Sequence, residues 1–264
     1  MKPPLENVDW LIILAFPNGG STAIAKLLMT AEGTVALNPT NEGQWLVPAM
    51  SAPRSRWNPR HNLNYEDIRT RWIEAIRRNL RASNPGGSQY LVIEKSPPNM
   101  CRYRAIISML SGMKTDIIVM TRDPYATCAS WHNRYGRKGI DRDWGWPGQP
   151  PTDEYSYFHA LGKIWIERAT YLHSARSDAT CWIRYEDFVD HPSVTVAQLV
   201  EKISCLRGVN ADANIQVKDY PSQKIRNMNK EQIASLTKNQ MTAISSALTE
   251  ASELVVRFGY DVTP

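Results

Sequence analysis

Residues 10–28 read Trp10-Leu-Ile-Ile-Leu-Ala-Phe-Pro-Asn-Gly-Gly-Ser-Thr-Ala-Ile-Ala-Lys-Leu-Leu28, and they decide how the rest of the chain is interpreted. Leu11 to Phe16 is a short apolar run that stops at Pro17. Such a run is typical of a central strand in a parallel sheet, because both faces of that strand are buried. Apolar residues then recur at helical spacing up to Leu28. The stretch therefore predicts a strand, a tight loop and the start of a helix.

The loop between this strand and this helix has the composition of an anion site. Gly19 and Gly20 permit a sharp backbone turn, and the hydroxyl of Ser21 or Thr22 can cap the helix. Unpaired amides at a helix start bind phosphate and similar anions, with help from the helix dipole. Lys26 lies inside the predicted helix and not at the loop end, which argues against an ATP or GTP hydrolase. The alternative interpretation is an ordinary turn between strand and helix, in which the glycines serve only the backbone geometry.

Length and composition predict one α/β domain that covers residues 1–264. A chain of 264 residues with 42% hydrophobic and 22% charged residues can bury one sizeable core. Its net charge of +5 suits an anionic ligand, although a solvated surface gives the same excess. No signal peptide is visible and no apolar run approaches the ~20 residues of a membrane span, so we expect a cytoplasmic protein without a membrane partner. The four cysteines lack zinc-site spacing, so no metal is expected.

A second predicted strand, residues 90–93, runs into Glu94 and Lys95. Ligands of open α/β sheets bind at the carboxyl ends of parallel strands, where these two residues are expected to lie. An acid and an ammonium group there can serve in catalysis. A plain surface ion pair is the alternative.

A third predicted strand, residues 114–120, runs into Thr121-Arg122-Asp123-Pro124. Pro124 suits the first turn of a helix, with Asp123 as its cap. Arg122 ends the strand and Ser130 lies two helical turns further on, so both can converge on one anion. Arginine favours bidentate contacts with phosphate.

Two long segments lack periodicity and are predicted to be loops. Residues 38–62 are rich in Pro, Asn and Arg, and we expect them to form part of an acceptor pocket with Trp45 and Trp57 as walls. Residues 131–155 mix glycines, prolines, aromatics and both signs of charge, which favours an irregular binding loop. Interleaved basic and aromatic residues also occur in nucleic-acid sites, but this stretch is short and rich in Asp, so no nucleic-acid partner is expected.

Taken in order, these motifs resemble those of the sulfotransferases that use 3'-phosphoadenosine 5'-phosphosulfate (PAPS). Phe16-Pro-Asn-Gly-Gly-Ser-Thr22 is similar to the family's 5'-phosphosulfate loop, and Arg122-Asp-Pro followed by Ser130 is similar to its 3'-phosphate motif. Arg184-Tyr-Glu-Asp-Phe188 is similar to a third family segment. The resemblance covers nearly the whole chain and implies a P-loop-like sulfotransferase fold, with a central parallel sheet flanked by helices.

The resemblance implies a set of site residues. Nucleotide contacts are expected from the loop residues and the 3'-phosphate motif, from the tyrosine of the third segment and from a basic loop, namely Asn18, Gly19, Gly20, Ser21, Thr22, Ala23, Arg122, Ser130, Tyr185, Lys224 and Arg226. Glu94 matches the catalytic base of the heparan-type enzymes, and Lys95 lies beside it. His132 and His159 are expected, with Trp45, to position the acceptor.

One departure from the family pattern bears on mechanism. Asn18 stands where relatives carry a Lys or Arg that neutralises the bridging oxygen. Lys95 is the candidate replacement for that missing cation.

The predicted function is transfer of a sulfuryl group from PAPS, with PAP as product, to a hydroxyl or amine of a small-molecule acceptor from specialised metabolism. The alternatives are a P-loop kinase-like phosphotransferase and an inactive PAP- or nucleotide-binding protein. Acidic Asp141 and Asp143 favour a cationic acceptor and Arg134, Arg137 and Arg142 an anionic one, so the acceptor's charge and the oligomeric state stay open.

Overall fold

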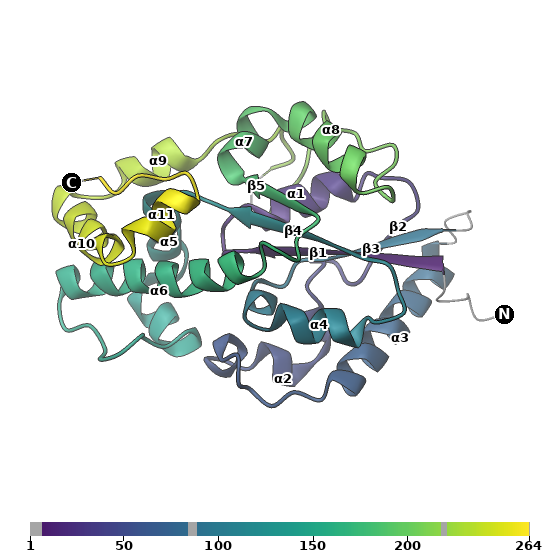
Figure 1. The fold of residues 1–264 in the computed structure, drawn as a ribbon, viewed down its shortest axis with the longest axis horizontal. Coiled ribbons are helices and arrows are strands. Elements are labelled where there is room, and N and C mark those ends of the chain that lie inside the picture. Colours follow the sequence, from purple (N-terminus) through teal and green to yellow (C-terminus); the bar gives the residue numbers. More distant parts are fainter. Residues whose placement is uncertain (1–6, 84–88, 218–220, 264) are drawn as a thin grey trace.

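The computed structural model describes residues 7–83, 89–217 and 221–263. A five-stranded, fully parallel sheet forms its centre, with strand order β2-β3-β1-β4-β5 (Figure 1). The strands are β1 (Val8–Ala15), β2 (Thr34–Ala36), β3 (Tyr90–Glu94), β4 (Thr115–Thr121) and β5 (Cys181–Arg184). The expected α/β fold with a central parallel sheet is confirmed.

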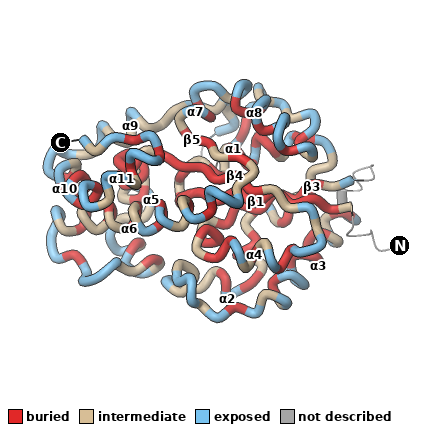
Figure 2. The backbone as a smooth tube through the Cα atoms, in the orientation of Figure 1, coloured by how far each residue is buried: buried red, intermediate tan, exposed pale blue. Residues whose placement is uncertain are grey.

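The sheet is buried on both faces, which explains the continuous apolar runs of its strands. Along β1, Trp10, Ile12 and Leu14 pack into one hydrophobic cluster. Leu11 and Ile13 alternate with them and pack into a second cluster on the opposite face. Figure 2 shows the strands as buried and the outer turns of the helices as exposed.

Helices cover the two faces of the sheet. The face shown above the strands in Figure 1 carries α1 (Ser21–Leu28), α7 (Tyr185–Asp190) and α8 (Pro192–Lys202). The opposite face carries α2 (Pro48–Ser51), α3 (Tyr65–Ser83), α4 (Tyr103–Met109) and α6 (Glu154–Ser174). The remaining helices are α5 (Pro124–Asp143), α9 (Asn229–Ala234), α10 (Lys238–Thr249) and α11 (Ser252–Arg257), and α10 packs along α6. Short 3₁₀ turns are η2 (Gly43–Leu46), η3 (Ser55–Trp57) and η4 (Pro97–Arg102).

The predicted irregular loop over residues 131–155 is wrong for its first half. Helix α5 continues to Asp143, with a kink at Gly136, whose φ of 60° and ψ of 175° are not helical. Glycine tolerates this backbone, so the helix changes direction there and continues. At the helix start, Asp123 accepts a hydrogen bond from the Ala126 amide, and the predicted cap is confirmed.

Candidate functional site

A cavity of about 630 Å³ opens at the carboxyl edge of the sheet. Because all five strands are parallel, the segments that follow them meet at this one edge. The cavity is lined by the loop after β1, by the segments after β2 and β3, by the ends of β4 and β5, and by part of α5. Of the expected site residues, those that line it are Asn18, Gly20, Ser21, Thr22, Ala23, Trp45, Lys95, Arg122, Ser130, Tyr185, Lys224 and Arg226.

The loop after β1 is shaped by left-handed backbone conformations. Gly20 is the N-cap of α1 with a φ of 96°, so the predicted cap at Ser21 or Thr22 is wrong and both hydroxyls are left for other contacts. A Cβ added at Gly20 would lie 2.5 Å from the Tyr185 ring, so only glycine fits between loop and ring. The first amides of α1 have no intrahelical partners, which suits an anion.

Asn18 has a left-handed backbone conformation. Its φ is 55°, a region that asparagine tolerates better than lysine or arginine. Its side-chain amide donates to the Ser130 carbonyl at 3.3 Å, and the Tyr135 hydroxyl donates to its Oδ1 at 3.5 Å. The residue therefore joins the β1 loop to α5.

Arg122 is almost fully buried at the end of β4. Its Nη1 donates to the Asn18 carbonyl at 2.6 Å and its Nε to Asn229 Oδ1 at 2.8 Å. The guanidinium carbon lies 4.3 Å from the centroid of the Tyr185 ring. Nη2 is buried and has no hydrogen-bond partner among the described residues. Burial lowers the pKa of this guanidinium, and an anionic ligand would both neutralise its charge and satisfy its orphaned nitrogen.

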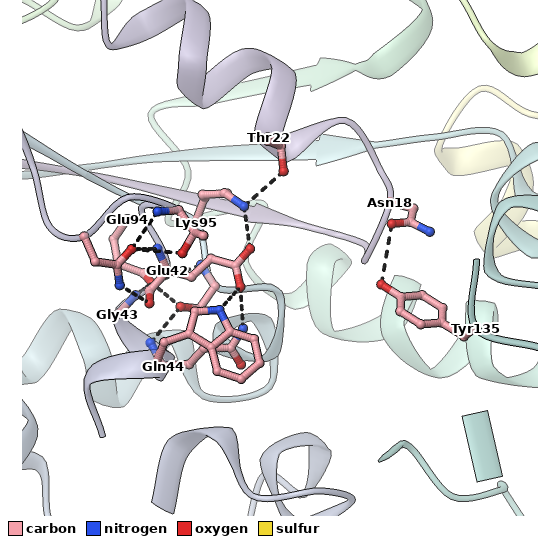
Figure 3. A network of polar contacts seen from close by, with 12 residues as sticks. Asn18, Thr22, Glu42, Gly43, Gln44, Glu94, Lys95 and Tyr135 are labelled. Carbon is pink, nitrogen blue, oxygen red and sulfur yellow. Dashed lines mark hydrogen bonds and ion pairs between the residues drawn. The ribbon is translucent and has the colours of Figure 1, made fainter. Parts of the chain in front are cut away.

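Lys95 lies between the loop and a carboxylate that the sequence did not indicate (Figure 3). Its ammonium group donates to Thr22 Oγ1 at 3.0 Å and to Glu42 Oε1 at 2.5 Å. The lysine side chain is 4% exposed and that of Glu42 16%. Lys95 thus brings a cation to the β1 loop, where Asn18 brings none.

Glu42 is held rigidly at the cavity wall. Its second oxygen, Oε2, accepts from Gln44 Nε2 at 2.7 Å and from Trp45 Nε1 at 2.8 Å. The next residue, Gly43, packs so closely against Trp72 that a Cβ would lie 2.3 Å from the indole. Sequence reasoning missed Glu42 because it lies in the aperiodic segment 38–62. The available signal was an acid followed by glycine after a short strand, which is weak by itself.

Glu94 lies behind this wall and does not line the cavity. It is 0% exposed, and its carboxylate accepts hydrogen bonds from the Gly43 amide, the Ser96 amide and hydroxyl, and Asn99 Nδ2. Burial raises the pKa of Glu94 to about 7, against the lowering effect of these hydrogen bonds. In this position the Glu94 carboxylate holds the backbone next to Glu42 through hydrogen bonds and is not exposed to the cavity.

The basic loop near residue 224 contributes cations that already have partners. Lys224 donates to Asp212, with 3.1 Å between Nζ and Oδ1, and Arg226 Nη1 lies 2.7 Å from Glu231 Oε1. Tyr185 is fixed from this side, because its hydroxyl accepts from the Met228 amide at 3.2 Å. Both cations line the cavity but would have to exchange partners to bind a phosphate.

Besides Glu94, three further expected residues do not line the cavity. Gly19 turns its amide back to the Phe16 carbonyl at 2.9 Å. His132 contacts the Tyr157 hydroxyl at 3.2 Å, and burial lowers its pKa. His159 faces Glu250 with 3.5 Å between Nε2 and Oε1. His132 packs against the rings of Tyr157 and Phe158, whereas His159 is partly exposed beside Glu250.

No group of three or more His, Cys, Asp or Glu that could hold a metal ion occurs within residues 7–83, 89–217 and 221–263. Among the same residues, no helix is long and apolar enough to cross a membrane.

Comparison with solved structures identifies similar folds at low sequence identity. The sulfotransferase domain of the Synechococcus PCC 7002 olefin synthase has a TM-score of 0.53 and 18% identity, covering 100% of this chain and 99% of that chain. The sulfotransferase domain of the curacin biosynthetic pathway has a TM-score of 0.51 and 13% identity, covering 97% and 99%. A sulfotransferase from Alicyclobacillus acidocaldarius has a TM-score of 0.51 and 12% identity, covering 95% and 96%.

No curated protein matches the sequence. The model of the Sulfotransferase family, however, matches residues 11–205, which is most of the chain and includes the β1 loop, Glu42, Lys95, Arg122 and Tyr185. This chain belongs to the sulfotransferase family.

Proposed function

We propose that this protein transfers a sulfuryl group from PAPS to a hydroxyl or amine of a small acceptor from specialised metabolism. The observation that supports PAPS as the donor is the buried Nη2 of Arg122. It has no hydrogen-bond partner among the described residues, and it lies at the sheet edge that also bears the glycine loop. The acceptor class is supported by analogy, since two of the similar folds come from a biosynthetic pathway and an olefin synthase.

The residues of this chain fit a nucleotide with anionic groups at both its 3' and 5' positions. The amides of the β1 loop and the Ser21 and Thr22 hydroxyls would hold the 5'-phosphosulfate. Arg122 and Ser130 would hold the 3'-phosphate, and the Tyr185 ring would lie near the adenine. PAPS supplies an activated sulfuryl group whose bond to the phosphate oxygen breaks as a new bond to the acceptor oxygen or nitrogen forms.

We propose Glu42, in place of Glu94, as the group that takes the acceptor's proton. Glu42 lines the cavity and Glu94 does not, and a general base must come within hydrogen-bond reach of the proton that it removes. Lys95 contacts both Glu42 and Thr22, so it would stabilise charge on the departing phosphate while it orients the carboxylate.

The donor assignment is tested by calorimetry with PAP and by sulfate transfer from labelled PAPS to a panel of hydroxyl and amine acceptors. Arg122→Ala is expected to weaken PAP binding by about 10- to 100-fold, the loss of one contact to an ionised group. Arg176→Ala is the control and should bind PAP normally, because Arg176 precedes β5 and does not line the cavity. No heat with PAP in the wild-type protein would refute the nucleotide site.

Two rival functions predict different outcomes. A P-loop kinase-like enzyme would consume ATP with one of the acceptors and would require magnesium. An inactive nucleotide-binding protein would bind PAP without sulfate transfer to any acceptor of the panel.

A further inference from the structure

The acceptor end of the cavity contains a cation without an ionic partner. Arg56, in η3, lines the cavity together with Glu42, Trp57, Tyr135 and Trp144. Among the described residues, no hydrogen bond or ion pair engages its guanidinium, and its Nε is buried without a partner. Buried polar groups in native proteins are rarely left unpaired, so this nitrogen requires an explanation.

The acids near Arg56 are engaged elsewhere. Glu42 is paired with Lys95, and Asp143 accepts two hydrogen bonds of 2.8 Å from Arg142. The charges of Asp143 and Glu42 raise the pKa of Arg56, but burial outweighs them and lowers it. The cation is therefore desolvated without being neutralised by a direct partner.

A second buried cation reinforces the positive field from behind the cavity wall. The guanidinium carbon of Arg168 lies 3.9 Å from the ring centroids of both Trp57 and Trp144. It is 3% exposed, its Nη1 has no hydrogen-bond partner among the described residues, and burial lowers its pKa to about 9. Excess positive charge in a low-dielectric wall attracts an anion.

Basic residues of α5 also bear on this charge. Arg134 lines the cavity, whereas Arg137 donates to the Pro151 carbonyl and Arg142 pairs with Asp143. The structure thus adds the 3₁₀ turn η3 to residues 131–155 as a source of positive charge near the acceptor.

We propose that the acceptor carries an acidic group, a carboxylate or a sulfate or phosphate ester, that pairs with Arg56 while its apolar body lies against Trp57, Tyr135 and Trp144. The aromatic wall is preformed, since Trp144 makes edge contacts with Trp57 at 5.7 Å and with Tyr135 at 5.0 Å. Guanidinium groups pair with carboxylate and ester oxygens in a planar, bidentate geometry, which would fix the hydroxyl or amine toward Glu42. The inference rests on the proposed transferase function, because it treats this end of the cavity as the acceptor site.

The test compares acceptors that differ only in charge. 4-Hydroxyphenylacetate, its methyl ester and its amide are titrated against the wild-type protein with and without PAP, and binding is followed by tryptophan fluorescence. The same compounds are assayed as acceptors of sulfate from PAPS. We expect the acid to bind more tightly than the ester and the amide.

Substitutions of Arg56 test whether this residue causes the preference for the acid. Arg56→Gln should weaken binding of the acid by about 10- to 100-fold and leave the ester unchanged, because it deletes one charge-assisted contact. Arg56→Lys should recover part of the preference for the acid. Arg54→Gln is the control, since the Arg54 side chain is 60% exposed, pairs with Asp141 and does not line this cavity.

The inference is overturned if the wild-type protein binds the acid no better than the ester and amide, or if Arg56→Gln affects acid and ester alike. Calorimetry with PAP separates this failure from that of the proposed function. Loss of the acid preference with normal PAP binding refutes only the inference. Arg56-dependent binding of the acid in a protein that binds no PAP would uphold the anion site and refute the transferase.

Discussion

Two glutamates lie close together on the β2–β3 side of the cavity, and their surroundings differ. Glu42 forms an ion pair with Lys95 and lines the cavity. Glu94 accepts hydrogen bonds from four neutral donors and is shielded from solvent. The proposed roles follow from this difference: Glu42 lies within reach of a bound acceptor, and Glu94 is enclosed by the residues that it orders.

Substitution of each glutamate separates these roles. Glu42→Gln should lower turnover by about 10²–10⁴-fold, the usual contribution of a general base, with PAP affinity retained. Glu94→Gln should retain much more turnover and instead lower the free energy of unfolding. Steady-state rates and urea unfolding of both variants check this, and full activity of Glu42→Gln with an inactive Glu94→Gln would return the base to Glu94.

Glu94 should also make stability depend on pH. Its pKa is about 7 in the folded protein and 4.5 in the unfolded chain, so the folded state binds the extra proton between these values. The associated stability is present below pH 4.5 and is lost as pH rises to about 7, with a total change of about 3 kcal/mol. Other groups titrate as well, so the quantity to measure is the difference in unfolding free energy between wild type and Glu94→Gln at pH 5 and pH 8. An equal difference at both pH values would show that the pKa of Glu94 is not raised.

At the scale of elements, the β1 loop and the start of α7 are fitted to one another. The Tyr185 ring occupies the space beside Gly20, and Arg122 stacks on the same ring. The conformation of the loop therefore depends on a residue far along the chain.

Gly20→Ala tests this fit against a matched glycine. Both Gly20, with a φ of 96°, and Gly148, with a φ of 99°, have left-handed backbones, but only at Gly20 would a Cβ meet other atoms. Gly20→Ala should lower the free energy of unfolding by roughly 1–3 kcal/mol and abolish PAP binding, whereas Gly148→Ala should show only the smaller backbone cost. Thermal melts and PAP calorimetry distinguish them; equal effects in the two variants would mean that the Tyr185 contact is unimportant.

At the scale of the whole molecule, the cavity joins segments from both faces of the sheet. Its lining includes residues after β1 and β5 as well as residues of α5 and of the segment between β2 and α3. A ligand that bridges these segments binds only the folded chain, so it should stabilise the fold as a unit.

PAP should therefore raise the resistance of the protein to unfolding. At a free concentration one hundred times its Kd, the expected gain is about 2.7 kcal/mol, which urea unfolding with and without PAP measures. Adenosine, which lacks both phosphates, should give little gain, and Arg122→Ala should lose most of the effect of PAP. A gain from adenosine equal to that from PAP would contradict recognition through the phosphates.

The amino-acid sequence alone was enough to predict the parallel sheet, the helices that follow β1 and β4, and the edge at which the cavity lies. Apolar runs and helical periodicity are local properties, and the parallel order of the strands sends every strand end to one edge. Gly20, Lys95 and Arg122 belong to motifs next to strand ends and line the cavity; Tyr185, expected from the family resemblance alone, lines it too.

Which of these side chains face the cavity became clear from the three-dimensional structure. It placed Glu42, from an aperiodic segment, beside Lys95, and Glu94 behind them. It left Arg56 Nε buried without a hydrogen-bond partner in the part of the chain that the structure describes. It also turned residues 131–143 into a helix, because packing against the core outweighs a composition that favours a loop. Exposure and pairing depend on contacts between segments far apart in the chain, and local sequence patterns carry no information about those contacts.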